Sequence, residues 1–149
     1  MDYWKRIDIE DNFTRQKFPS FVRYSDFLGY PYWQGTMFTN SNKCYIIRVE
    51  VSADFPLLRP KLYITSPCPL YTFWGKKLAD LGATQYMHTY GPKNGWVQMC
   101  VCRDECWSSD DSIFKCLKKA RVWIEAYDAH LRTGKNMDKI VGHQELWDN

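Results

Sequence analysis

Three cysteines lie within seven positions of the segment MCVCRDECW, which covers residues 99–107. Cys100, Cys102 and Cys106 could bind a metal, form a redox pair or supply a nucleophile. A thiolate is a strong nucleophile, and a thioester formed on it stays reactive toward amines. Free cysteines are also often small buried hydrophobes. Which chemistry applies depends on the rest of the chain.

A zinc site built from these cysteines and His88 would have unusual spacing. Structural zinc sites favour a gap of about two to four residues in each ligand pair, and only Cys102 to Cys106 fits. A zinc deaminase would need His-x-Glu followed by Pro-Cys-x-x-Cys. HQE at 143–145 supplies the first half, but it follows the cysteines. The sequence therefore predicts no metal and no cofactor.

Composition indicates one globular domain over residues 1–149, with 45% hydrophobic and 17% aromatic residues. The net charge of +3 comes from scattered cations, which predicts no nucleic-acid partner. The first residues, MDYWKRIDIED, lack a signal-peptide pattern, and no apolar run approaches about eighteen residues. We therefore expect no membrane span, a cytoplasmic protein and reduced cysteines rather than a disulfide framework.

Periodicity predicts the elements that position the cysteines. A short helix is expected in the first twenty residues, stopped by Pro19, and FVRYSDFL, CYIIRVEVS and KLYIT are expected as strands. The irregular middle of the chain separates them from the short apolar WVQMCVC. Residues 110–132 are expected as the longest helix, with N-cap candidates in SSDDS and a C-cap at Gly134. The predicted class is α+β, with an N-terminal helix and C-terminal helices on a four-stranded antiparallel meander.

The segment VEVSADFPLLRPKLYITSP resembles a signature of the ubiquitin-conjugating enzyme fold. In that family an aromatic-Pro-x-x-x-Pro segment joins two strands and is followed by Lys and an apolar residue. The matching residues here are Phe55, Pro56, Pro60, Lys61 and Leu62. Because proline fixes the backbone, we expect the two prolines to hold an extended loop. Catalytically inactive relatives such as RWD domains carry a similar motif.

Further matches follow in the family's order. The family has a His-starting loop, a Gly, an apolar-Cys-apolar triplet and a Trp before a long helix. This chain has His88, Gly95, MCV at 99–101 and Trp107 before the predicted helix. The eukaryotic enzymes read His-Pro-Asn where this chain reads HTY at 88–90, so the family's Asn is missing.

The end of the chain, WIEAYDAHLRTGKNMDKIVGHQ, is similar to ubiquitin-conjugating-like proteins of bacterial CBASS anti-phage operons. The matching residues are Trp123, Tyr127, Thr133, Gly134 and His143. This resemblance implies a transferase that carries the C-terminus of a CD-NTase as a cysteine thioester. The chain has no Gly-rich nucleotide loop, so activation would come from a separate enzyme or the conjugate would form without one. The alternative is an RWD-like protein-binding module without catalysis.

The resemblance assigns the nucleophile to Cys100, with Cys102 as the alternative. Cys100 has apolar neighbours and lies seven residues before Trp107, close to the family spacing, whereas Cys102 is followed by an arginine. His88 is expected to shape the loop. Asn94 could lend its amide to an oxyanion, although PKNG is also a good turn. Trp107 would cover the loop of the thiol or simply pack in the core.

Overall fold

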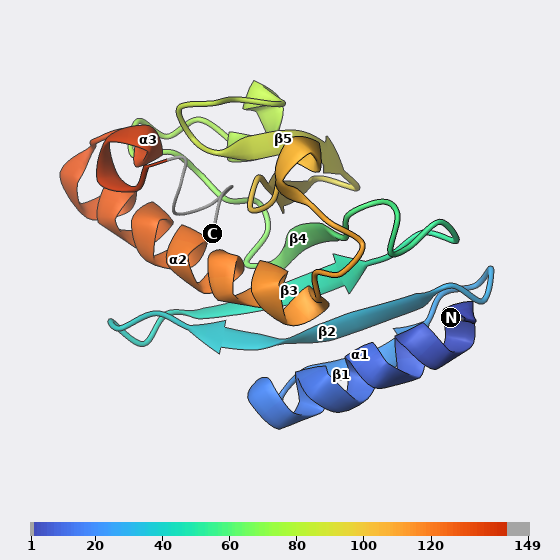
Figure 1. Cartoon of the computed structure of the whole chain (residues 1–149). Coiled ribbons are helices and arrows are strands. Elements are labelled where there is room, and N and C mark those ends of the chain that lie inside the picture. Colours follow the sequence, from blue (N-terminus) through green and yellow to red (C-terminus); the bar gives the residue numbers. More distant parts are fainter. Residues whose placement is uncertain (1, 143–149) are drawn as a thin grey trace.

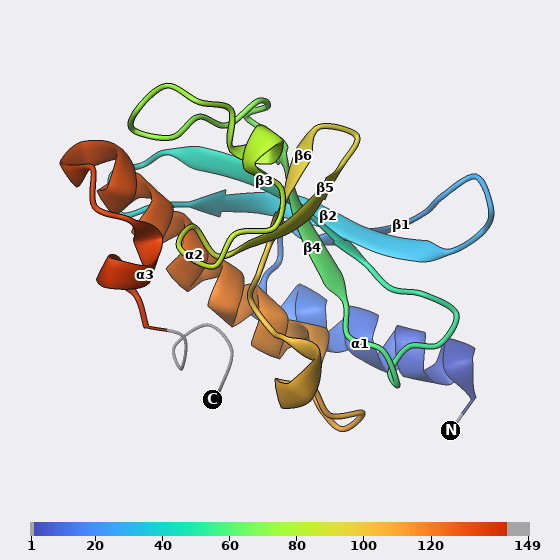
Figure 2. The same cartoon turned by 90° about the horizontal axis from the view of Figure 1, so that it is seen from above.

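The computed structural model describes residues 2–142, which form a six-stranded antiparallel sheet with helices against one face (Figures 1 and 2). The strands lie in the order β1-β2-β3-β4-β6-β5. Their bounds are β1 Val22–Ser25, β2 Pro31–Phe38, β3 Cys44–Glu50, β4 Lys61–Ser66, β5 Thr89–Lys93 and β6 Trp96–Met99. The helices are α1 Tyr3–Lys17, α2 Ile113–Thr133 and α3 Met137–Ile140, with 3-10 turns η1 Leu78–Leu81 and η2 Asp104–Cys106.

The predicted class is confirmed, but the strand count is wrong, since the sheet of the described residues has six strands and not four. The expected irregular middle of the chain contains β5, which pairs with β6. Gly91 and Pro92 lie within β5, and the register shifts between Tyr90 and Lys93, so the segment has no regular alternation. A β-bulge of this kind hides a strand from a period-two pattern.

Other predicted elements are confirmed. The strand β3 lies between β2 and β4 and pairs antiparallel with both. Its alternate residues Tyr45, Ile47 and Val49 are buried, as a sheet with one covered face requires. The longest helix is α2, and Gly134 ends it in the left-handed conformation with φ of 76°.

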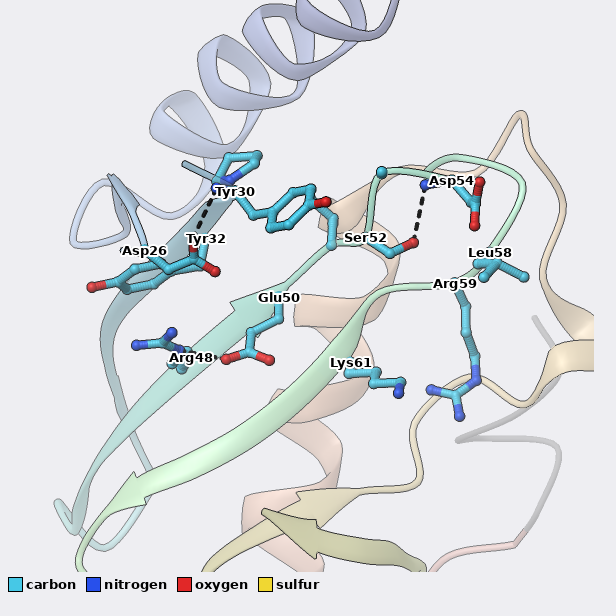
Figure 3. A pocket seen from close by; sticks show the side chains of 13 residues that line it. Asp26, Tyr30, Tyr32, Arg48, Glu50, Ser52, Asp54, Leu58, Arg59 and Lys61 are labelled. Atoms are coloured by element: carbon cyan, nitrogen blue, oxygen red, sulfur yellow. Dashed lines mark hydrogen bonds and ion pairs between the residues drawn. The ribbon is translucent and has the colours of Figure 1, made fainter. Parts of the chain in front are cut away.

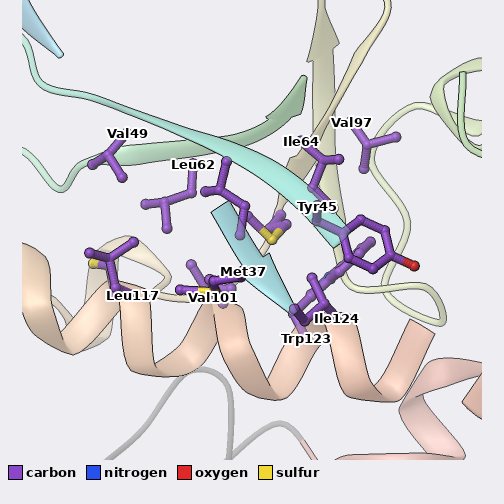
Figure 4. Close-up of a cluster of buried hydrophobic side chains, with 14 of the residues drawn as sticks. Met37, Tyr45, Val49, Leu62, Ile64, Val97, Val101, Leu117, Trp123 and Ile124 are labelled. Carbon is purple, nitrogen blue, oxygen red and sulfur yellow. The ribbon is translucent and has the colours of Figure 1, made fainter. Parts of the chain in front are cut away.

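The core fills the space between the inner face of the sheet and α2 (Figure 4). Both α1 and α2 lie on this face of the sheet (Figure 2). The side chains labelled in Figure 4 come from four strands, from the segment after β6 and from α2: Met37, Tyr45, Val49, Leu62, Ile64, Val97, Val101, Leu117, Trp123 and Ile124. None of the helices between residues 2 and 142 is long and apolar enough to cross a membrane.

The segment between β3 and β4 carries the two prolines, and it is a series of turns rather than the extended loop expected. The carbonyl of Ser52 accepts the Phe55 N–H, and that of Asp54 accepts the Leu57 N–H at 2.7 Å. These bonds fold the segment into successive turns. Phe55, which is 3% exposed, packs in the core.

The start of α2 is held by α1 and not by the predicted SSDDS cap. Ser112 is the N-cap residue, but its side chain makes no capping bond. The buried carboxylate of Glu10 accepts the N–H of Ile113 at 2.9 Å. Arg6 pairs with Glu10 at 3.0 Å and donates to the carbonyl of Asp111. The two helices are therefore joined by a polar contact that spans about a hundred residues of sequence.

We expect Glu10→Ala to lower the free energy of unfolding by about 1–3 kcal/mol, because a buried N–H loses its acceptor. Urea unfolding monitored by circular dichroism measures the change. The matched control is Asp8→Ala, which removes a more exposed pair with Arg23 and costs about 0–1 kcal/mol. Equal losses in the two variants would contradict the capping role of Glu10.

Candidate active site

Cys100 is the first residue after β6, and its backbone N–H donates to the carbonyl of His88 at 2.9 Å. Its side chain is 5% exposed. The main cluster of buried hydrophobic side chains includes its neighbours Met99 and Val101 but not Cys100. Successive residues of an extended segment point to opposite faces, so Cys100 lies on the side of the sheet away from α2.

The hydroxyl of Tyr90 interacts with the Cys100 thiol. Burial, and after it this interaction, raise the pKa of Tyr90 well above its ordinary value. The phenol therefore keeps its proton at neutral pH and can donate it. Tyr90 is opposite Gln98 in the β5–β6 pair, which makes it a diagonal neighbour of Cys100 on one face.

The guanidinium group of Arg59 lies over the ring of Tyr90. The guanidinium carbon of Arg59 lies 4.3 Å from the centre of the Tyr90 ring, and its Nε donates to Asp104 at 2.9 Å. The Arg59 side chain is only 12% exposed, so its charge is poorly screened by water. Cys100 is thus bordered by a phenol donor and a nearby fixed positive charge.

His88 supports the backbone of Cys100. Its carbonyl accepts both the Cys100 N–H and, at 2.7 Å, the indole N–H of Trp123 in α2. Its buried ring is hydrogen-bonded to the carbonyl of Val141 at 3.3 Å. The backbone of His88 has φ of 52°, a left-handed value that is uncommon for residues other than glycine. This placement matches the expected loop-shaping role.

Cys102, the alternative nucleophile, is inside the core. It is 2% exposed and belongs to the main hydrophobic cluster, where the thiol of Cys116 donates to it at 3.5 Å. This hydrogen bond, with a smaller effect of the Lys115 and Lys119 charges, lowers the pKa of Cys102. The same bond and burial raise the pKa of Cys116. Cys102 is easier to ionise than a standard thiol, but it faces α2 rather than the surface.

The other two predicted supporting residues lie elsewhere. Asn94 is exposed and forms the β5–β6 turn with Gly95, both with positive φ. This turn is at the opposite end of β6 from Cys100, so the structure agrees with the turn that PKNG predicts rather than with an oxyanion donor. Trp107 donates its indole N–H to the carbonyl of Pro56 at 2.8 Å and packs against Phe55. It ties the segment after Cys100 to the turns between β3 and β4.

The structure does not gather a metal site from the cysteine segment. Within residues 2–142, no three His, Cys, Asp or Glu side chains come together in a group that could hold a metal ion. Cys106 accepts from Arg103 at 3.4 Å, whereas Cys102 faces Cys116. His143 and the HQE sequence lie outside the described residues. That the protein binds no metal stays a prediction.

A pocket of about 480 Å³ opens on the outer face of the sheet (Figure 3). It lies between the start of β2, the end of β3, the start of β4 and the turns that join β3 to β4. Tyr30 and Tyr32 line one side, while Arg59 and Lys61 line another. Its volume is within the usual range for ligand sites, about 300–1,000 Å³. Arg59 links it to Tyr90 and so to the surroundings of Cys100.

Sequence reasoning missed Tyr90, Arg59 and Lys61 as members of this site. The tripeptide HTY at the place of the family's His-Pro-Asn was a usable signal for Tyr90. Arg59 and Lys61 lie in the predicted proline motif, and the pairing of β4 with β6 and the contact of Arg59 with Tyr90 are tertiary features that this motif does not contain. Comparison of the sequence with protein-family models gave no match, and comparison with curated proteins gave no significant match.

Proposed function

We propose that this chain is a cytoplasmic ubiquitin-conjugating-like transferase of bacterial CBASS defence, with Cys100 carrying the C-terminus of a CD-NTase as a thioester. The order of sequence motifs suggests the family. The observation that carries the proposal is the position of Cys100 beside Tyr90 and outside the main hydrophobic cluster, while Cys102 belongs to that cluster and faces Cys116 of α2.

The chemistry is a transthioesterification. The Cys100 thiolate attacks the carbonyl carbon of an acyl group that a separate protein has activated as a thioester. A new carbon–sulfur bond forms, the old one breaks, and the leaving thiolate takes up the proton that Cys100 lost. The negative oxygen of the intermediate needs a donor, and the Tyr90 phenol supplies one. Tyr90 stands at the place of the asparagine that the eukaryotic enzymes use.

Removal of the Tyr90 hydroxyl is expected to slow acylation of Cys100 by roughly 100-fold, the usual cost of losing one oxyanion donor. The variant is Tyr90→Phe, and the measurement is the single-turnover rate of thioester formation. Tyr24→Phe is the control, because Tyr24 is an exposed tyrosine that stacks on Tyr32 in the same sheet. An unchanged rate in Tyr90→Phe would remove Tyr90 from the mechanism.

The test of the function is co-expression with a CD-NTase and its neighbouring genes from the same genome, so that a separate activating protein encoded there is supplied. Intact-mass analysis should find a species of the summed mass less one water. Hydroxylamine cleaves a thioester but not an amide, so the treatment also identifies the linkage. A complex that copurifies without any covalent species would favour the RWD-like binding module.

A further inference from the structure

Lys61 is the first residue of β4 and lies beside Cys100 by strand register. In the β4–β6 pair, Tyr63 is opposite Gln98 and Leu62 is opposite Met99. Continuing this antiparallel register by one residue places Lys61 opposite Cys100. On its other side Lys61 pairs with Glu50 of β3. Side chains directly opposite in an antiparallel pair have Cβ atoms about 5 Å apart.

The two side chains share one face of the sheet. Leu62 and Met99 are both 1% exposed and point into the core, so the residues next to them project the other way. The interaction of Tyr90 with Cys100 agrees with this orientation, because Tyr90 is opposite Gln98 on the same face. Figure 3 shows Lys61 on that outer face, at the edge of the pocket.

The amine of Lys61 is available for reaction. Lys61 is exposed, lines the 480 Å³ pocket and makes no ion pair with any side chain between residues 2 and 142. Two other cationic side chains on this face, Arg48 and Lys93, each form an ion pair with Glu50 at 2.7 Å. The pocket leaves room for a flexible lysine side chain and for the end of an acyl chain.

We propose that Lys61 accepts the acyl group from Cys100 within the same molecule, so that the chain modifies itself. This inference rests on the proposed thioester at Cys100. The neutral Lys61 amine attacks the thioester carbonyl, the carbon–nitrogen bond forms, and the carbon–sulfur bond breaks. The amine proton is released to solvent, and the Cys100 thiolate takes up a proton. The products are an amide on Lys61 and a regenerated thiol.

The test uses a synthetic peptide that ends in glycine as a thioester with a small thiol, so that no activating enzyme is needed. The exposed thiols are first removed in a Cys44→Ser, Cys68→Ser background. Acylation of Cys100 should appear as a hydroxylamine-sensitive mass gain. The thioester should convert with time to a hydroxylamine-resistant product, and peptide mapping should place the peptide of this product on Lys61. Conversion should speed up as the pH rises, because only the neutral amine attacks.

In Lys61→Arg we expect the thioester to persist, with resistant product reduced at least roughly tenfold. Lys77→Arg, which changes another exposed lysine, should convert like the parent. Melting temperatures of both variants check that they are folded. A resistant product that forms equally fast in Lys61→Arg would overturn the role of Lys61. If Cys100 is never acylated in any variant, the proposed function itself fails.

Discussion

Cys100→Ala is expected to abolish the covalent species formed with a CD-NTase. Among the buried cysteines of the described residues, Cys100 lies outside the main hydrophobic cluster, and it interacts with the hydroxyl of Tyr90. Alanine removes only the sulfur, and the backbone bond to the His88 carbonyl remains. We therefore expect the Cys100→Ala protein to stay folded and to form no adduct. Intact-mass analysis after co-expression measures it.

The companion variants separate chemistry from stability. Cys102→Ala and Cys116→Ala remove buried thiols that pair with each other, so they should lower stability but keep the adduct. Cys44→Ala changes an exposed residue and should leave both the stability and the adduct unchanged. Cys100→Ser should replace a thioester by a more stable ester or give no adduct. An adduct in Cys100→Ala would shift the assignment to Cys102.

Trp123→Ala is expected to lower the free energy of unfolding by about 3–5 kcal/mol, the usual cost of removing a large aromatic side chain from a core. Trp123 is completely buried in α2 and stacks on Tyr127 with ring centres 5.5 Å apart. Its indole N–H donates to the His88 carbonyl, which also accepts the Cys100 N–H. The substitution therefore removes core packing and a support of the candidate site together. Urea unfolding at 25 °C measures the change.

A milder variant isolates the hydrogen bond. Trp123→Phe keeps an aromatic ring but removes the indole N–H, which should cost about 1–2 kcal/mol. Val122→Ala is the control on the same helix, because Val122 is half-buried and should cost less than Trp123→Ala. If Trp123→Ala were no more harmful than Val122→Ala, α2 would not be anchored through Trp123.

The fold was predictable where local patterns repeat. In β3 every second residue is buried, and in α2 the buried residues recur at helical spacing, because one face of each element packs against the core. Such patterns of apolar residues can be read from the sequence. The bulged β5 has no such pattern. The start of α2 could not be predicted either, because Glu10 holds it from a helix about a hundred residues earlier.

The candidate site was predictable only in part. The apolar triplet pointed to Cys100, and His88 supports the loop as expected. PKNG indicated the turn at Asn94, but the sequence did not show that the length of β6 separates this turn from the thiol. Strand register sets the positions of Tyr90 and Lys61 relative to the end of β6, and register is a long-range property that no short motif contains.

The most direct test of the account is to locate the acyl group on the chain. Tryptic digestion of the adduct at mildly acidic pH, where thioesters survive, should yield residues 94–103 carrying the C-terminal peptide of the partner. This fragment contains both Cys100 and Cys102, and tandem mass spectrometry separates them at Val101. We predict the modification on Cys100, or on Lys61 after prolonged incubation. A modification confined to Cys102, or an adduct in which neither Cys100 nor Lys61 carries the partner's C-terminal peptide, would contradict the account.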